Sequence, residues 1–346
     1  MTARVLRRLA VLAAGLAAVT FLWALFQPFA GDGGAAVQVV IPKDAGVSRI
    51  GDILDGRGVV PSGALFSLRA RLAGDSGDLK PGTYTLRKHM TYGSVLDRLV
   101  AGPASDVLRL TIPEGLSRRE ITPLAARAGV RGNYLAASAR GALLAYRDYG
   151  LARPPATLEG FLFPATYELR RGTSATRLVE KQLVAFRENF AGVDLSYAKR
   201  KNLTAFDVLT IASMVERETM VARERRLVAA VIYNRLHARQ PLGIDATTRY
   251  ITGNWSTPLT TSQLAIDSPY NTRRNPGLPP GPIGNPGLAS IEAAARPARV
   301  GYLYYVVKPG TCGEHAFSST FAQFQQDQRR YEEARRAAGG KSPTKC

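Results

Sequence analysis

The chain has 346 residues, enough for two or three domains with a sizeable core. An apolar content of 45% and a charged content of 21% fit a globular protein and exclude a largely disordered one. Lys and Arg number 46 against 27 Asp and Glu, so the formal net charge is +19 and the surface attracts polyanions such as nucleic acid, acidic lipid or an acidic wall polymer. Charge alone does not choose among these partners.

The first clear pattern is at the N-terminus. Arg4, Arg7 and Arg8 precede an uncharged apolar run, Leu9 to Phe26. At 1.5 Å per residue, eighteen residues span about 27 Å, close to the roughly 30 Å hydrocarbon core of a bilayer. The arginines predict a cytoplasmic N-terminus with everything after residue 29 outside. A cleaved signal peptide is the alternative, but the run is long for one and lacks a small-x-small cleavage site.

Short strands and helices alternate after this run. We expect a flexible linker at 31–36, a strand at 37–41, a turn that enters a second strand at 79–86, and helices at 47–57 and 92–100. The segment VIPKDAGVSRIGDILDGRGV near residue 40 has a counterpart in TIPEGLSRREITPLAARAGV near residue 111. The two segments indicate either a duplicated module or the common form of any strand–turn–helix.

The second half is mainly helical, which together with the strands predicts an α+β protein. Helices are expected at 174–190, 203–220, 222–239, 287–296 and 320–338, with a strand at 302–307 and a turn-rich segment at 241–286. Thr204 and Asp207 have the spacing of a capping box at the start of the second of these helices.

The 203–220 helix carries the strongest candidate for chemistry. On a helical wheel Glu218 lies on the apolar face with Val208 and Val215, whereas Glu216 lies on another side. An apolar environment raises the pKa of a carboxyl group, which suits a general acid working near neutral pH. The alternative is that Glu218 only ends the buried stretch and reaches water or an Arg.

A series of motifs then resembles one known family over nearly the whole chain. IASMVERET, VAAVIYNRL, GIDATTRY, SPYNTR, GLPPGPIGNPG and YLYYVV…HAFS, preceded by KPGTY, IPEG and LEGFLFPATY, resemble the YceG-like family of endolytic murein transglycosylases. The chain departs from the family pattern at Ala165, where Asp is usual, and at Ala246, where Pro is usual. The first departure leaves no acidic group at that position, and the second affects the rigidity of a turn.

The resemblance implies a lyase that cleaves the β-1,4 bond between N-acetylmuramic acid and N-acetylglucosamine in nascent peptidoglycan strands. Glu218, followed by Thr219 as in related enzymes, would protonate the glycosidic oxygen and then deprotonate the C6 hydroxyl, leaving a 1,6-anhydromuramic end. The enzyme would then be a terminase of glycan elongation. No second carboxylate is needed, and we expect no metal and no cofactor, since three histidines and two cysteines show no ligand spacing.

Further residues are candidates for substrate binding, each with a structural alternative in a turn, a salt bridge or a satisfied core position. They are Glu216, Thr219, Asp245, Thr247, Tyr270, Asn271 and His315, with Glu159 and Tyr167 as weaker candidates. For Glu216 a salt bridge on the helix surface is the favoured interpretation. Cys312 and Cys346 form one bridge or remain thiols.

The expected organisation is a single membrane-spanning helix, a small α/β module and a mixed, mainly helical catalytic domain. The ranges are 1–8 for a cytoplasmic tail, 9–29 for the transmembrane anchor, 30–36 for the linker, 37–113 for a LysM-like module implied by the resemblance, and 114–346 for the YceG-like catalytic domain. The protein would be a single-pass inner-membrane protein whose catalytic domain lies on the periplasmic side. Its partners would be glycan strands and possible peptidoglycan synthases, and no nucleic acid.

Two other functions fit the same sequence. One is a non-catalytic, membrane-anchored scaffold that binds peptidoglycan, for which an acid on an apolar helix face has no use. The other is a hydrolytic muramidase, which needs a base or nucleophile opposite Glu218, and Asp245 is the candidate.

Overall fold

The computed structural model describes residues 3–27, 34–103 and 107–345, and for 3–6 and 8–10 the backbone alone. The chain divides into two compact units, Met1–Asp106 and Val107–Cys346. The described residues form three two-stranded antiparallel sheets among many helices, which confirms the α+β class. The predicted boundary at 113/114 lies a few residues later than this division, because the strand that begins at Val107 pairs within the second unit.

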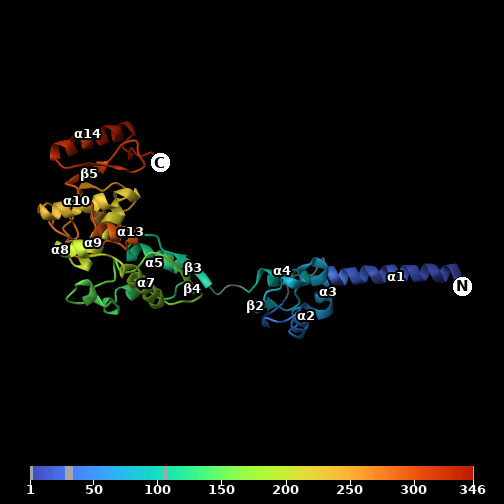
Figure 1. The fold of residues 1–346 in the computed structure, drawn as a ribbon. Coiled ribbons are helices and arrows are strands. Elements are labelled where there is room, and N and C mark those ends of the chain that lie inside the picture. Colours follow the sequence, from blue (N-terminus) through green and yellow to red (C-terminus); the bar gives the residue numbers. More distant parts are fainter. Residues whose placement is uncertain (1–2, 28–33, 104–106, 346) are drawn as a thin grey trace. The chain divides into compact units, whose positions relative to one another are not determined.

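The first unit is built on the pair β1 (Ala36–Ile41) and β2 (Gly82–Arg87), with Ala36 opposite Arg87. Between these strands the chain forms α2 (Val47–Gly56), α3 (Gly63–Ala73) and the 3₁₀ helix η1 (Asp75–Gly77), and α4 (Tyr92–Ala101) follows β2. α2 and α3 lie side by side (Figure 1). A Cβ atom on Gly51 or Gly63 would collide with the backbone of the other helix, so glycine permits this close packing.

The N-terminal helix α1 (Ala3–Phe26) ends against the rest of the first unit. Leu25 is buried, the Gln27 side chain accepts a 3.0 Å hydrogen bond from the backbone N–H of Tyr92, and Arg69 lies over the Phe26 ring. Within the described residues, no helix combines the length and the apolar character that crossing a membrane requires. The Leu9 and Ala10 side chains of the expected span, and residues 30–33 of the expected linker, lie outside the described residues.

The second unit opens with a strand pair of the same kind. β3 (Val107–Thr111) pairs with β4 (Thr166–Arg170), and α5 (Arg118–Arg127), α6 (Tyr134–Ser138) and the 3₁₀ helices η2 (Gly141–Leu143) and η3 (Tyr146–Tyr149) lie between them in sequence. The two related sequence segments therefore each form a strand followed by a helix. A common origin by duplication stays a prediction.

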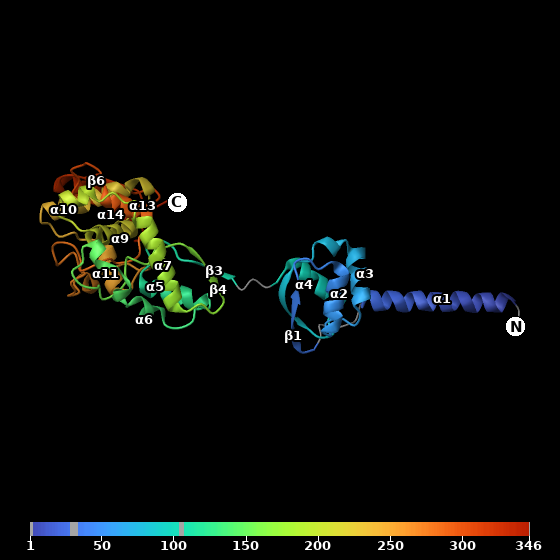
Figure 2. The ribbon, with the colours of Figure 1, turned by 60° about the horizontal axis from the view of Figure 1, so that its bottom comes forward.

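A bundle of helices forms the core of the second unit. It contains α7 (Ala175–Phe190), α8 (Ser196–Arg200), α9 (Ala205–Glu218), the 3₁₀ helix η4 (Ala222–Glu224), α10 (Arg225–His237), α11 (Asp245–Thr252), α12 (Thr261–Leu264) and α13 (Leu288–Ala295). α9, α10 and α13 pack against one another (Figure 2). The capping box of Thr204 and Asp207 is confirmed. However, every residue from Val208 to Val215 is buried, so α9 has no single apolar face and the wheel argument was wrong on this point.

The C-terminal part adds a hairpin covered by a helix. β5 (Tyr304–Val307) pairs with β6 (His315–Ser318), and α14 (Phe321–Ala337) packs on β5 through Phe324, whose ring stacks on Tyr304 at 5.0 Å. Cys312, in the hairpin loop, is disulfide-bonded, and Cys346 lies outside the described residues.

Candidate active site

Glu218 is the last residue of the buried helix α9. Thr219, the next residue, has an extended backbone conformation, so the helix ends at Glu218. The Glu218 side chain is partly buried, unlike the fully buried residues 208–215. A carboxyl group is thus fixed at the edge of a rigid core.

Two hydrogen bonds hold the Glu218 carboxyl group. The backbone N–H of Ala246, in the first turn of α11, donates to Oε1 at 3.2 Å. The hydroxyl of Tyr305, on β5, donates to Oε2 at 3.1 Å. Each carboxyl oxygen therefore has a different donor, supplied by a different element.

The surroundings of Glu218 raise its pKa above the usual value. Burial is the main cause, and the negative charge of Asp245 acts in the same direction, while the hydrogen bonds from Ala246 and Tyr305 and the proximity of His315 oppose it. The C-terminal end of α9 also disfavours a negative charge there. A protonated carboxyl at a partly accessible position is what a general acid requires.

His315 is held next to this site by a buried carboxylate. Its Nδ1 lies 2.8 Å from Glu224 Oε2, and its backbone N–H donates to Glu224 Oε1 at 3.0 Å. The side chains of His315 and Glu224 are only 7% and 6% exposed. The imidazole meets the Tyr305 ring edge to face, with ring centroids 5.1 Å apart.

Asp245 precedes Ala246 in the chain, and its negative charge is close enough to Glu218 to raise the pKa of that carboxyl group. Its carboxylate is half-exposed and forms an ion pair with Arg273. Asp245 is thus near the candidate acid but is engaged by a cation.

Three of the candidate binding residues have side chains engaged in contacts within the second unit. Thr247 is buried and donates to the Ile244 carbonyl at 2.7 Å, and Asn271 is buried and donates to the carbonyls of Leu264 and Ile266. The Tyr270 ring packs on Tyr250 at 5.2 Å. The hydroxyl of Thr219 is buried and has no hydrogen-bond partner within the described residues.

Glu216 lies on another side of α9 from Glu218. It accepts a 3.0 Å hydrogen bond from the Gly287 N–H and lies 3.7 Å from Arg225. A salt bridge is present as the sequence favoured, but its surface position was wrong, because the Glu216 side chain is only 8% exposed.

Glu159 and Tyr167 take part in separate contacts. Glu159 is buried and accepts hydrogen bonds from the Arg118 N–H, the Asn285 amide and the Tyr250 hydroxyl. Burial raises the pKa of Glu159 to about 7, although the hydrogen bonds from these donors act to lower it. Tyr167 donates to the Phe163 carbonyl at 2.5 Å. Neither residue contacts Glu218 in the described interactions.

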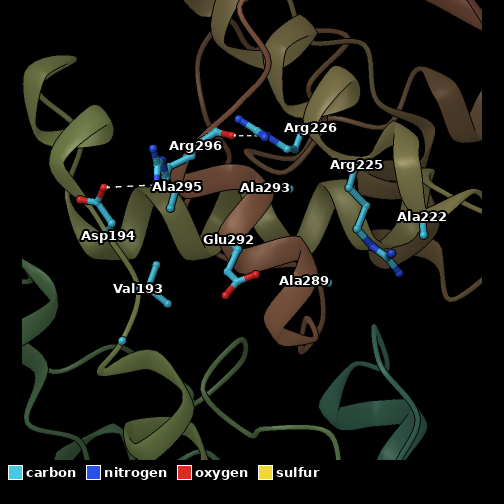
Figure 3. Close-up of a pocket in the computed structure, with 11 residues that line it drawn as sticks. Val193, Asp194, Ala222, Arg225, Arg226, Ala289, Glu292, Ala293, Ala295 and Arg296 are labelled. Carbon is cyan, nitrogen blue, oxygen red and sulfur yellow. Dashed lines mark hydrogen bonds and ion pairs between the residues drawn. The ribbon is translucent and has the colours of Figure 1, made fainter.

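The second unit contains a cavity of about 630 Å³ that is lined in part by Arg225 and Arg226 (Figure 3). Ala289, Glu292 and Ala293 of α13 are among the residues that line it. Glu218, Tyr305 and Asp245 do not line it. Among the described residues, no three His, Cys, Asp or Glu side chains are grouped to hold a metal ion.

Sequence reasoning missed two residues that complete the surroundings of Glu218. Tyr305 was assigned only to the strand expected at 302–307, and Glu224 only to the helix expected at 222–239. The period-2 alternation of YLYYVV could have separated Tyr305 from Tyr304, because neighbouring strand residues face opposite sides. Nothing local in the sequence indicates that Glu224 meets His315, ninety-one residues later in the chain.

Comparison with known proteins bears on this site directly. The sequence profile of the YceG-like family matches residues 39–330. The chain belongs to the YceG-like family. This confirms the resemblance that the motifs indicated, and both Glu218 and Tyr305 lie inside the matched range.

Relatives with known names have similar sequences. The endolytic murein transglycosylase of Bacillus subtilis (strain 168) is 30% identical over 325 residues, covering 89% of this YceG-like chain and 88% of the relative. That of Streptococcus pneumoniae (strain ATCC BAA-255 / R6) is 33% identical over 300 residues, covering 78% of this chain and 54% of the relative.

A solved structure agrees in fold. The crystal structure of a YceG-like protein from Listeria monocytogenes superimposes with a TM-score of 0.57 at 29% sequence identity. The alignment covers 84% of this chain and 98% of the other.

Proposed function

We propose that this protein is an endolytic peptidoglycan lytic transglycosylase with Glu218 as its general acid and base. The observation that carries the proposal is the Glu218 carboxyl group itself. It is partly accessible, its pKa is raised by burial, and Ala246 and Tyr305 fix its orientation. Family membership and the names of the relatives support the same substrate.

The reaction needs one carboxyl group acting twice. Protonated Glu218 gives its proton to the glycosidic oxygen between N-acetylmuramic acid and N-acetylglucosamine as the bond from that oxygen to the muramic C1 breaks. The C6 hydroxyl of the same muramic residue then bonds to C1, and its proton passes to the Glu218 carboxylate. The product is a 1,6-anhydromuramic end, no water is consumed, and Glu218 is protonated again.

The remaining parts of the proposal concern location. The apolar run from Leu9 to Phe26, whose first two side chains lie outside the described residues, would hold the chain in the inner membrane as a single-pass anchor, with the second unit on the periplasmic side. Its large exposed side chains, such as Leu12, Leu16 and Trp23, support this role. The first unit, with two helices between antiparallel strands, would serve as a LysM-like module that binds nascent glycan next to the synthases, so that cleavage terminates elongation.

A hydrolytic muramidase is the alternative that the site keeps open, with Asp245 activating water. The Asp245 carboxylate is, however, already engaged in an ion pair with Arg273. A scaffold without activity would not require the Glu218 environment described above.

The test is product analysis on purified glycan strands. The wild-type chain should release fragments with 1,6-anhydromuramic ends from cuts within strands, as read by mass spectrometry. Glu218→Gln should abolish cleavage with the fold retained, while Glu216→Gln, the control on the same helix, should retain far more activity. Reducing muramic ends would establish the muramidase instead, and a fully active Glu218→Gln would refute the assignment of the catalyst.

A further inference from the structure

The geometry points to Tyr305 as a second catalytic residue, which stabilises the Glu218 carboxylate after it has given up its proton, with His315 and Glu224 as the residues that position it. This inference rests on the proposed function, because it concerns how the same carboxyl group exchanges its proton. It assigns a role to three residues, two of which sequence reasoning missed.

The first step is to decide which oxygen of Glu218 carries the proton. Oε1 accepts the N–H of Ala246, a donor that cannot accept in return. An oxygen that accepts such a bond is favoured as the carbonyl oxygen of the acid. The proton therefore resides on Oε2, the oxygen that faces the Tyr305 hydroxyl at 3.1 Å.

The second step concerns the moment of proton transfer. When Oε2 gives its proton to the glycosidic oxygen it becomes negatively charged, and the Tyr305 O–H then makes a charge-assisted hydrogen bond to it. Such bonds are roughly twice as strong as bonds between neutral groups. Tyr305 consequently stabilises the state that follows protonation more than the state that precedes it, which is the requirement for catalysis.

The third step is the positioning of the Tyr305 hydroxyl. Tyr305 and His315 lie on paired strands, and the His315 imidazole packs edge to face on the Tyr305 ring. Glu224 fixes that imidazole from η4 through both the ring and the backbone of His315. Because Glu224 and His315 are almost fully buried, the pair acts as a rigid support behind the ring.

The charged groups around Glu218 set the direction of the pH effect. Asp245 from α11 raises the pKa of Glu218, whereas Tyr305 from β5 and His315 from β6 lower it. The charge of Arg235 from α10 acts to lower the pKa of Tyr305, and Arg273 pairs with Asp245. Removing the Tyr305 hydroxyl therefore raises the pKa of Glu218 and extends its protonated form to higher pH.

The experiment compares Tyr305→Phe with Tyr304→Phe in the full chain on purified glycan strands. Phe keeps the ring that packs on His315 and removes only the hydroxyl. Tyr305→Phe should lower kcat about ten- to hundred-fold with KM little changed, and should move the alkaline limb of the pH–rate profile to higher pH. Tyr304→Phe, on the opposite strand face against Phe324, should leave kcat and that limb unchanged.

His315→Gln tests the positioning role. It should lower kcat in the wild-type background and lower it clearly less in the Tyr305→Phe background, since the imidazole acts mainly by positioning the hydroxyl. Additive losses would overturn the positioning role. Wild-type kcat and an unmoved alkaline limb in Tyr305→Phe, with Glu218→Gln inactive, would overturn the inference and leave the proposed function intact. An active Glu218→Gln would instead refute the proposed function.

Discussion

The guanidinium carbon of Arg217 lies 3.7 Å from the centre of the Trp255 ring. Arg217 also forms an ion pair with Glu120, which closes the capping box at the start of α5. Arg217 lies between Glu216 and Glu218 in the sequence. Its contacts therefore fix how the last turn of α9 is oriented about the helix axis. The two carboxyl groups are consequently kept on different sides of the helix, one facing Arg225 and the other facing Tyr305.

Replacing Arg217 with Met should therefore destabilise the second unit. The change removes a stacked cation and the ion-pair partner of Glu120, and we expect a loss of about 1–3 kcal/mol in the free energy of unfolding. Urea unfolding measures it. Arg223→Met is the matched control, because Arg223 is 69% exposed in its pair with Glu314 and should cost less than about 1 kcal/mol. Equal losses in the two variants would contradict the role given to Arg217.

The sequence predicted Glu218 and its helix but not what surrounds the carboxyl group. Helix positions and the capping box depend on neighbouring residues, so local patterns were sufficient for them. The donors to Glu218 come from Ala246 and Tyr305, far along the chain, and no local pattern encodes that meeting. The helical wheel failed because α9 is buried on all sides from Val208 to Val215. In such a helix the spacing of apolar residues does not indicate which side faces the core.

Glu159 should make stability fall as pH rises. Its pKa is about 7 in the folded protein against an ordinary value of 4.5, so between these values the folded state keeps a proton that the unfolded state has lost. The free energy of unfolding therefore decreases through this window, with a contribution of up to about 1.4 kcal/mol per pH unit, and is constant above it. Chemical unfolding of wild type and Glu159→Gln at pH 5 and pH 7.5 isolates the effect. If both proteins lose the same stability between these pH values, Glu159 is not the group responsible.

Gly51→Ala should destabilise the first unit, because its added methyl group meets the backbone of Gly63 where α2 and α3 touch. We expect a loss of about 1–3 kcal/mol, the usual cost of overpacking. Gly56→Ala, also in α2, is the control, because a Cβ atom there meets nothing within 4 Å. Thermal unfolding should show a lower Tm for Gly51→Ala alone. An unchanged Tm would mean that α2 and α3 can move apart to accept the methyl group without loss of stability.

The proposed anchor predicts that the full chain stays with the inner membrane and resists extraction by salt. A charged side chain in the middle of a membrane-spanning helix costs about 2.5–3.5 kcal/mol, so Leu16→Arg together with Val19→Arg should release the protein into the soluble fraction. Leu72→Arg is the control, since Leu72 is 63% exposed on α3 and lies outside the apolar run. Fractionation, with protease added to intact spheroplasts, reads both the attachment and the side on which the second unit lies.

Retention of the double variant in the membrane would argue against α1 as the anchor. A purified protein whose first residue lies near position 30 would show that the apolar run is a cleaved signal. Protection of the second unit from protease would contradict the proposed function, because peptidoglycan strands are outside the cytoplasm.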